Sequence, residues 1–238
     1  MEHERLNRSR GPSGEALVRA AARIDATDPA LPRAQGLYDP RHEHDSCGVG
    51  FIADMANRKS HEIVTKGLQI LLNLDHRGAV GADPKLGDGC GILVQIPHRF
   101  FSEEMAKGGV TLPEPREYGI GQFFMPRDEA ARSEIRRIVE RVLEEEGLTF
   151  LGWRDVPVDN SDLGDAVKAV EPVHNQVFLG RGPGVRDEDD FERRLYIARK
   201  VVSNAIYAAG KREMAEYYPV SMSCRTIVYK GMVLVKQL

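Results

Sequence analysis

From residue 47 onward, short apolar runs alternate with stretches in which apolar residues recur every three or four positions. The runs GVGFIADM, GCGILVQI and YGIGQFFM have the length and composition of strands, and Pro97 ends the second because proline cannot donate to a β-ladder. Positions 64, 68, 71 and 72 are apolar and share one face of a helix. By itself this alternation favours a doubly wound α/β sheet, although layered α+β folds show the same pattern.

Further segments extend the same alternation to the end of the sequence. An amphipathic helix is predicted around 135–143, a short helix is predicted to open at the N-cap candidate Ser161, and a long helix is predicted over 191–209. LTFLGWRDVPV, QVFLGRG and SCRTIVYKGM are predicted strands, and 57–60 is a predicted polar turn. Residues 1–46 have little periodicity and several prolines, so we interpret them as a mostly irregular leader and 47–238 as the folded domain.

Charge and hydropathy exclude two classes of function. Lysine and arginine number 33 against 36 acidic residues, so the chain lacks the positive field that nucleic-acid binding requires. Apolar runs such as 68–74 and 92–96 fall short of the about 20 residues needed to span a bilayer. The N-terminal segment mixes arginines with acidic residues and lacks the apolar core of a signal peptide, and three widely spaced cysteines make no disulfide framework. We therefore expect a cytoplasmic protein.

Several kinds of site can be weighed from local motifs. His42, His44 and Cys47, with Asp45 between them, could ligate zinc, but their spacing matches no recurrent zinc pattern, and solvated histidines are the more ordinary interpretation. The segments GDGCG and GRGPG fit neither dinucleotide nor phosphate-loop motifs and are expected to form turns. No G-x-S-x-G elbow supports a serine triad.

Cysteine chemistry is the remaining option. A free thiol with a pKa of about 8.5 is only about 3% ionised at neutral pH, so Cys47 needs a base or a positive neighbour to react fast. Without such a group, Cys47 would be an ordinary buried cysteine at the start of a strand. Cys90, enclosed by glycines, and Cys224, in an apolar-bordered strand, are interpreted as structural.

Four separated segments together identify a family. GLYDPRHEHDSCGVGFIAD, GLQILLNLDHRGAVGADPKLGDGCGILVQIPHRFF, QVFLGR and SCRTIVYKGM closely resemble, in this order, the N-terminal part of glutamate synthase large subunits. The resemblance implies a class II glutamine amidotransferase domain with the α+β fold of N-terminal-nucleophile hydrolases, an αββα sandwich. This fold replaces the doubly wound expectation.

The resemblance also implies a site. Removal of the leader at the junction Ser46-Cys47 would give Cys47 a free α-amine, whose pKa of about 7.7–8.0 suits a general base. The thiolate would then attack the side-chain amide of L-glutamine, and water would hydrolyse the thioester to glutamate. Arg77, in LDHRGA, matches the arginine beside the nucleophile, with a role in holding the local loop or the substrate.

Part of the family pattern is not found. The sequence ends at KGMVLVKQL, before the family's histidine-asparagine-glycine oxyanion segment and its histidine-serine-arginine segment, and His174-Asn175-Gln176 does not replace the former. We therefore expect a sandwich that is incomplete at the C-terminus and little turnover from this chain alone. A non-catalytic remnant or assembly module is the alternative. The chain itself is expected to bind no cofactor, because FMN and an iron-sulfur cluster belong to the remaining synthase domains, its partners in cis or in trans.

Overall fold

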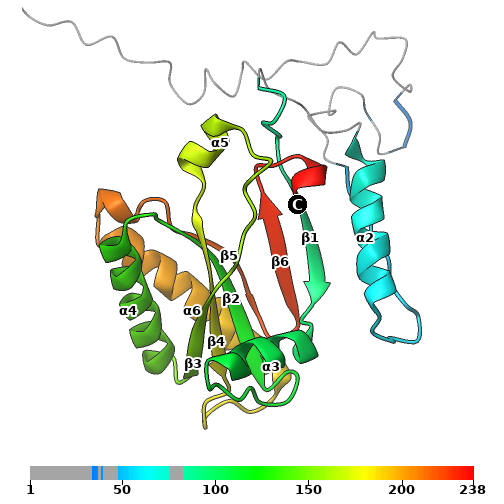
Figure 1. Cartoon of the computed structure of the whole chain (residues 1–238). Coiled ribbons are helices and arrows are strands. Elements are labelled where there is room, and N and C mark those ends of the chain that lie inside the picture. Colours follow the sequence, from blue (N-terminus) through cyan, green and yellow to red (C-terminus); the bar gives the residue numbers. More distant parts are fainter. Residues whose placement is uncertain (1–33, 37–38, 40–47, 76–82) are drawn as a thin grey trace, which may run out of the picture. The chain divides into compact units, whose positions relative to one another are not determined.

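The computed structural model describes residues 34–36, 39, 48–75 and 83–238, and the chain divides into two compact units, 1–48 and 49–238. All elements named below belong to the second unit (Figure 1). Its strands are β1 (Cys90–Gln95), β2 (Tyr118–Met125), β3 (Thr149–Asp155), β4 (Val173–Gly180), β5 (Tyr218–Ser223) and β6 (Thr226–Gly231). Its helices are α2 (His61–Asn73), α3 (His98–Lys107), α4 (Glu129–Glu145), α5 (Asp165–Val170) and α6 (Glu188–Ala208), with the 3-10 turns η3 (Arg212–Met214) and η4 (Val235–Gln237).

The described strands form two sheets, and every pairing in them is antiparallel. One sheet has the order β3-β4-β2-β5, and the other pairs β1 with β6. The mixed α+β prediction is confirmed at this level, whereas the doubly wound parallel sheet is wrong. The physical reason is that α4 and α6 both pack on one face of the four-stranded sheet, whereas a doubly wound sheet carries helices on both faces.

Side-chain caps explain where several helices begin. The hydroxyl of Ser60 accepts from the amide of Ile63 at the start of α2, and the carboxylate of Asp128 accepts from Ala131 at 2.7 Å at the start of α4. The predicted cap Ser161 is wrong, because α5 begins at Asp165 after Gly164, which has no capping side chain. The amide of Ser161 instead donates to the carboxylate of Asp159 at 2.9 Å in a turn.

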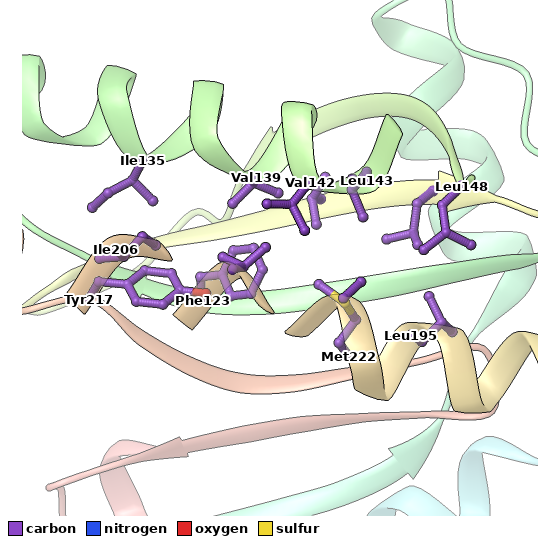
Figure 2. Packing of buried hydrophobic residues seen from close by; sticks show 14 of the residues in the cluster. Phe123, Ile135, Val139, Val142, Leu143, Leu148, Leu195, Ile206, Tyr217 and Met222 are labelled. Atoms are coloured by element: carbon purple, nitrogen blue, oxygen red, sulfur yellow. The ribbon is translucent and has the colours of Figure 1, made fainter. Parts of the chain in front are cut away.

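The helix-facing side of the four-stranded sheet carries the larger core. Alternate residues of β2 and β4, among them Phe123 and Val177, point into a cluster with side chains from α4 and α6. Figure 2 shows Ile135, Val139, Val142 and Leu143 of α4 directed toward Leu195 and Ile206 of α6. Apolar residues that repeat every 3.6 positions in the helices thus pack against apolar residues that repeat every second position in the strands.

The other side of this sheet faces β6. Tyr118 and Ile120 of β2 and Phe178 of β4 are buried with Ile227 of β6, and Phe101 of α3 closes one end of this second cluster. Within β2 and β4, residues of one cluster alternate with residues of the other, because neighbouring residues of a strand point to opposite faces.

A buried polar network crosses the space between the sheets. The side-chain amide of Gln176 donates to Gln122 Oε1 at 2.9 Å and to the hydroxyl of Tyr229 at 3.1 Å, and it accepts from Arg154 at 3.0 Å. Arg154 also pairs with Glu104 of α3 at 3.2 Å. Every polar group of Gln176 named here has a partner, so the network adds orientation without leaving a buried donor unpaired.

Two further strand predictions need correction, and one strand was missed. Residues 48–55 form no strand, and Val49 and Phe51 are 85% and 90% exposed, because the apolar run has no described strand beside it to supply hydrogen bonds. β5 was not predicted, since Pro219 and two serines interrupt its apolar pattern. Cys224 lies in the turn between β5 and β6 and not in a strand.

The remaining elements agree with the sequence patterns. β2 has the predicted bounds, 118–125, and the predicted helices around 64–75, 135–143 and 191–209 correspond to α2, α4 and α6. The apolar residues of α2 share one face as predicted, but none of the residues of this helix is fully buried.

Truncation of the central aromatic ring tests the larger core. Phe123→Ala removes a side chain with no exposed surface and leaves a cavity, so we expect a loss of about 3–5 kcal/mol in the free energy of unfolding, measured by urea titration. Phe150→Ala, at a ring that is 40% exposed, is the matched control and should cost less than about 1.5 kcal/mol. Equal losses for the two variants would contradict this description of the core.

Candidate functional site

The predicted site residues Ser46, Cys47 and Arg77 lie outside the described residues, as do His42, His44, Asp45 and His76. The chain segments that adjoin them are described, namely 48–50 after the cysteine and 74–75 and 83–89 on either side of the arginine. The geometry of these adjoining segments is therefore what the structure contributes to the site.

The segment that follows Cys47 lies against the second half of α2. Gly50 packs directly on the side chain of Ile70, with no room for a side chain of its own. Near the end of the helix, the amide of Leu74 donates to the carbonyls of Ile70 and Leu71 at 3.1 and 3.0 Å. Residue 50 and the end of α2 are therefore neighbours.

The same helix lies beside β1. A Cβ added to Gly67 would lie 3.2 Å from Cδ1 of Ile92, the third residue of β1. Because α2 continues from Gly67 to Leu74, its last turn brings the chain toward the start of β1.

The glycine-rich segment GDGCG leads into β1 and packs against residues near the C-terminal end of the sequence. Gly89 has φ +115°, a backbone conformation that favours glycine, and a Cβ on Gly87 would lie 2.5 Å from the carbonyl carbon of Val233. The expected turn at 87–91 is only partly present, because Cys90 and Gly91 already belong to β1, and the glycines at 87 and 89 allow two backbones to touch.

Electrostatics bring three of these segments to one place. Burial raises the pKa of the Cys90 thiol, and the carboxylates of Asp88 and Asp75 raise it further, so both acids lie near the first residue of β1. Asp75 ends the described segment before Arg77. The Cys90 thiol stays protonated at neutral pH and is not suited to nucleophilic attack.

Residues near the C-terminus bind the loop that precedes β1. The side-chain amide of Gln237 donates to the carbonyl of Asp162 at 3.0 Å and to that of Lys85 at 3.4 Å, and Lys85 forms an ion pair with Asp162 at 3.1 Å. The loop before β1, the loop before α5 and the C-terminal turn are thereby joined.

An aromatic and basic cluster, which the sequence did not reveal, lies close by. Lys230, opposite Gly91 in the β1–β6 register, donates to the hydroxyl of Tyr218 at 3.0 Å. Phe124 lies between Tyr218 and His174, with ring centroids 6.0 and 5.0 Å away. Burial lowers the pKa of His174, so its ring is neutral at pH 7. Phe124, His174 and Tyr218 come from β2, β4 and β5, and Lys230 comes from β6 in the other sheet. They meet only because the two sheets face each other.

The segment His174-Asn175-Gln176 has a structural role. It belongs to β4, as expected, and its side chains alternate between the two faces. The side-chain oxygen of Asn175 accepts from Arg136 at 2.8 Å on the helix-facing side, while Gln176 bonds Gln122 between the sheets. Both amides are already committed to neighbouring strands and helices.

Cys224 is equally unsuited to catalysis. Its thiol donates to Glu192 of α6 at 3.0 Å, and burial together with this carboxylate raises the pKa of Cys224 to about 12. The structural interpretation of this cysteine therefore agrees with its surroundings, although it lies in a turn.

Two classes of site can be checked in the part of the chain that the structure describes. No group of three or more histidine, cysteine or acidic side chains there is placed to hold a metal ion. None of the described helices is long and apolar enough to cross a membrane. The zinc alternative at His42, His44 and Cys47 falls outside the described residues.

Comparison with known proteins identifies relatives over most of the chain. The family model for class-II glutamine amidotransferases matches residues 47–238. The chain is 42% identical over 207 residues to the large chain of an NADPH glutamate synthase of Bacillus subtilis, covering 87% of this chain and 13% of that protein. It is 44% identical to an NADH glutamate synthase of Schizosaccharomyces pombe, covering 85% and 10%. It is 41% identical to a chloroplastic ferredoxin-dependent glutamate synthase of Arabidopsis thaliana, covering 84% and 12%.

These similarities confirm the resemblance that the sequence segments indicated. They also show that the chain spans only about an eighth or less of the length of these relatives.

The close approach at Gly87 gives a first test of the site's framework. Gly87→Ala forces the backbone away from Val233, so we expect a loss of about 1–3 kcal/mol in unfolding free energy by urea titration. Gly108→Ala is the control, because its nearest neighbour would be 3.6 Å away and its φ is −92°. A neutral effect of Gly87→Ala would mean that the two backbones are not in contact.

The surroundings of Cys90 give a second test. Asp88→Asn removes a negative charge that raises the pKa of the thiol, so alkylation of Cys90 by iodoacetamide at pH 8 should become faster, by roughly twofold or more. The rate is followed by peptide mass spectrometry. Asp162→Asn, which changes the same charge in the loop before α5, should leave the rate unchanged. Equal alkylation rates in wild type and Asp88→Asn would show that the charge of Asp88 does not act on the Cys90 thiol.

Proposed function

Because the chain belongs to the class-II glutamine amidotransferases, we propose that residues 47–238 are the glutaminase domain of a glutamate synthase. This domain hydrolyses the side-chain amide of L-glutamine to glutamate and ammonia. The identities of 41–44% to three glutamate synthases support the choice of this enzyme among the family's members. The ammonia would serve glutamate biosynthesis, and thus ammonia assimilation, in the remaining domains.

Cys47 is the proposed nucleophile, and removal of the leader 1–46 at the Ser46-Cys47 junction activates it. The family match begins at this residue, which supports a domain that starts there. The new α-amine takes the thiol proton, and the sulfur attacks the amide carbon of glutamine. The α-ammonium group returns this proton to the amide nitrogen, which leaves as ammonia, and water then cleaves the thioester. While the leader is attached, the nitrogen of Cys47 is an amide and has no basicity.

The convergence of the adjoining segments is the observation that carries this proposal. Gly50, three residues after Cys47 in the sequence, packs on Ile70 of α2. Arg77 is two residues from Asp75, whose charge acts on Cys90 at the start of β1. Both segments therefore lead to the same end of α2 and β1, where the guanidinium of Arg77 would hold the loop or the substrate carboxylate.

The other two cysteines support the assignment by contrast. Cys90 and Cys224 both have raised pKa values because they are buried and have acidic neighbours. Neither forms a thiolate at neutral pH, so covalent chemistry falls to Cys47.

We further propose that residues 47–238 adopt the αββα sandwich of the N-terminal-nucleophile hydrolases. The packing of α4 and α6 on the four-stranded sheet, of that sheet on β6, and of α2 beside β1 supports this order of layers.

The proposed reaction uses protein groups alone and takes no cofactor. FMN and the iron-sulfur cluster are assigned to the other synthase domains, which this domain would contact in cis or in trans as it passes ammonia on. We infer a reducing compartment, the cytoplasm, because the described cysteines are free thiols.

A glutamine analogue that carries a diazoketone tests the nucleophile. We expect the purified chain to lose residues 1–46 and to take up one label on Cys47, as seen by intact mass, N-terminal sequencing and peptide mass spectrometry. Cys47→Ala should retain residues 1–46 and take up no label, because it lacks the sulfur. Cys90→Ser, the matched control, should be processed and labelled like wild type.

Two results would contradict the proposal. One is labelling of Cys90 or Cys224 in wild type. The other is a folded, processed chain that takes up no label at a saturating concentration of the analogue.

A further inference from the structure

An open groove runs between α4 and the first residues of β3, on the side of the unit away from β6. β3 is the last strand in the order of its sheet, so no described strand covers its outer edge. Phe150 is 40% exposed beside this groove. The groove is lined by Arg137, Glu140, Arg141, Glu144, Leu148 and Phe150.

The charges on the C-terminal part of α4 run against its macrodipole. After the cap at Asp128 and Glu129, arginines occupy 132, 136 and 137, whereas glutamates occupy 144 and 145 and no basic residue lies in the last turn. A helix favours acidic residues at its N-terminus and basic ones at its C-terminus. α6 of the same unit also begins with acidic residues, Glu188, Asp189 and Asp190, and also has no basic residue in its last turn, but that turn carries no glutamate either. The reversed order on α4 is stabilised if an antiparallel helix with the same charges lies beside it.

We propose that the groove binds a second copy of this chain, with the two α4 helices antiparallel about a twofold axis between Glu140 and Arg141. Residues equally distant from the axis then face each other. Arg137 meets Glu144 of the partner subunit, and Arg141 meets Glu140 of the partner subunit. All four groove charges are paired by the one symmetry operation, and Phe150 contributes apolar surface beside them.

The four side chains are available for these contacts. Within the described part of the chain, neither Arg137 nor Glu144 takes part in an ion pair, and Arg141 has only an exposed one to Glu145 at 3.7 Å. Glu140 accepts from the indole of Trp153 through Oε1 at 2.6 Å, and its other oxygen can accept from an arginine.

The size of the surface sets the strength of the dimer. α4 has 17 residues and is about 26 Å long, so a helix pair with its flanking loop buries a small interface. A weak dimer follows, with association that depends on protein concentration and weakens as salt rises from about 0.05 M to about 0.5 M.

A charge swap across the axis tests the pairing. Sedimentation velocity on the 238-residue chain should show a monomer–dimer equilibrium. Arg137→Glu and Glu144→Arg should each weaken the dimer by about tenfold or more, because each places like charges opposite one another twice. An equimolar mixture of the two variants restores both opposite-charge pairs, so its affinity should return to within about threefold of wild type.

Matched controls separate this effect from net charge and from misfolding. Arg99→Glu on α3 makes the same charge change at a side chain that is 94% exposed, and it should leave the dimer unchanged. The neutral variants Arg137→Gln and Glu144→Gln should fold like wild type by circular dichroism and should reduce the salt dependence of association.

Three outcomes would overturn the proposal. They are a wild-type chain that stays monomeric up to about 200 µM, single reversals that do not weaken association, and a mixture that fails to recover it.

Discussion

The pairing of β2 with β4 is the constraint on which the rest of the unit depends. Eight residue pairs run without interruption from Tyr118 and Gly180 to Met125 and Val173. Because side chains alternate along a strand, this register decides which residues face α4 and α6 and which face β6. A shift by one residue would turn Phe123 and Val177 toward β6 and would carry the amide of Gln176 into the helix-facing core.

The two faces of the sheet differ in chemistry as a result. The helix-facing side is almost wholly apolar, whereas the side toward β6 combines apolar residues with the paired amides of Gln176 and Gln122 and, at one end, Lys230 and Tyr218. Polar groups concentrate near the ends of β1 and β6, where residues 48–50, the end of α2 and the glycine-rich turn also lie. A site placed there has a packed framework on one side and polar groups within reach on the other.

Charge is used differently by the two long helices. At the start of α6, Glu188 and Asp189 favour the helix dipole and also bind Arg225, which anchors the turn between β5 and β6. Glu192 then holds the thiol of Cys224 in the same turn. On α4, Asp128 and Glu129 likewise lie at the start, but Glu144 and Glu145 lie in the last turn. Glu140, between them, accepts from the indole of Trp153 in β3.

Local sequence determined those elements whose pattern is complete within one segment. YGIGQFFM sufficed for β2, and the helical spacings sufficed for α2, α4 and α6, because propensity and periodicity are properties of neighbouring residues. The four family segments likewise sufficed to identify the class-II glutamine amidotransferase family. The roles of Cys47 and Arg77 stay predictions.

Tertiary structure decided whatever depends on a partner elsewhere in the chain. Residues 48–55 have the composition of a strand but pair with no strand among the described residues, whereas β5 has a broken pattern yet pairs with β2. The sequence could not show that Asp75 and Asp88 meet at Cys90, or that Lys230, Tyr218, Phe124 and His174 share one face. Hydrogen bonds between strands and contacts between distant side chains are set by the register and packing of the whole sheet, which no single segment encodes.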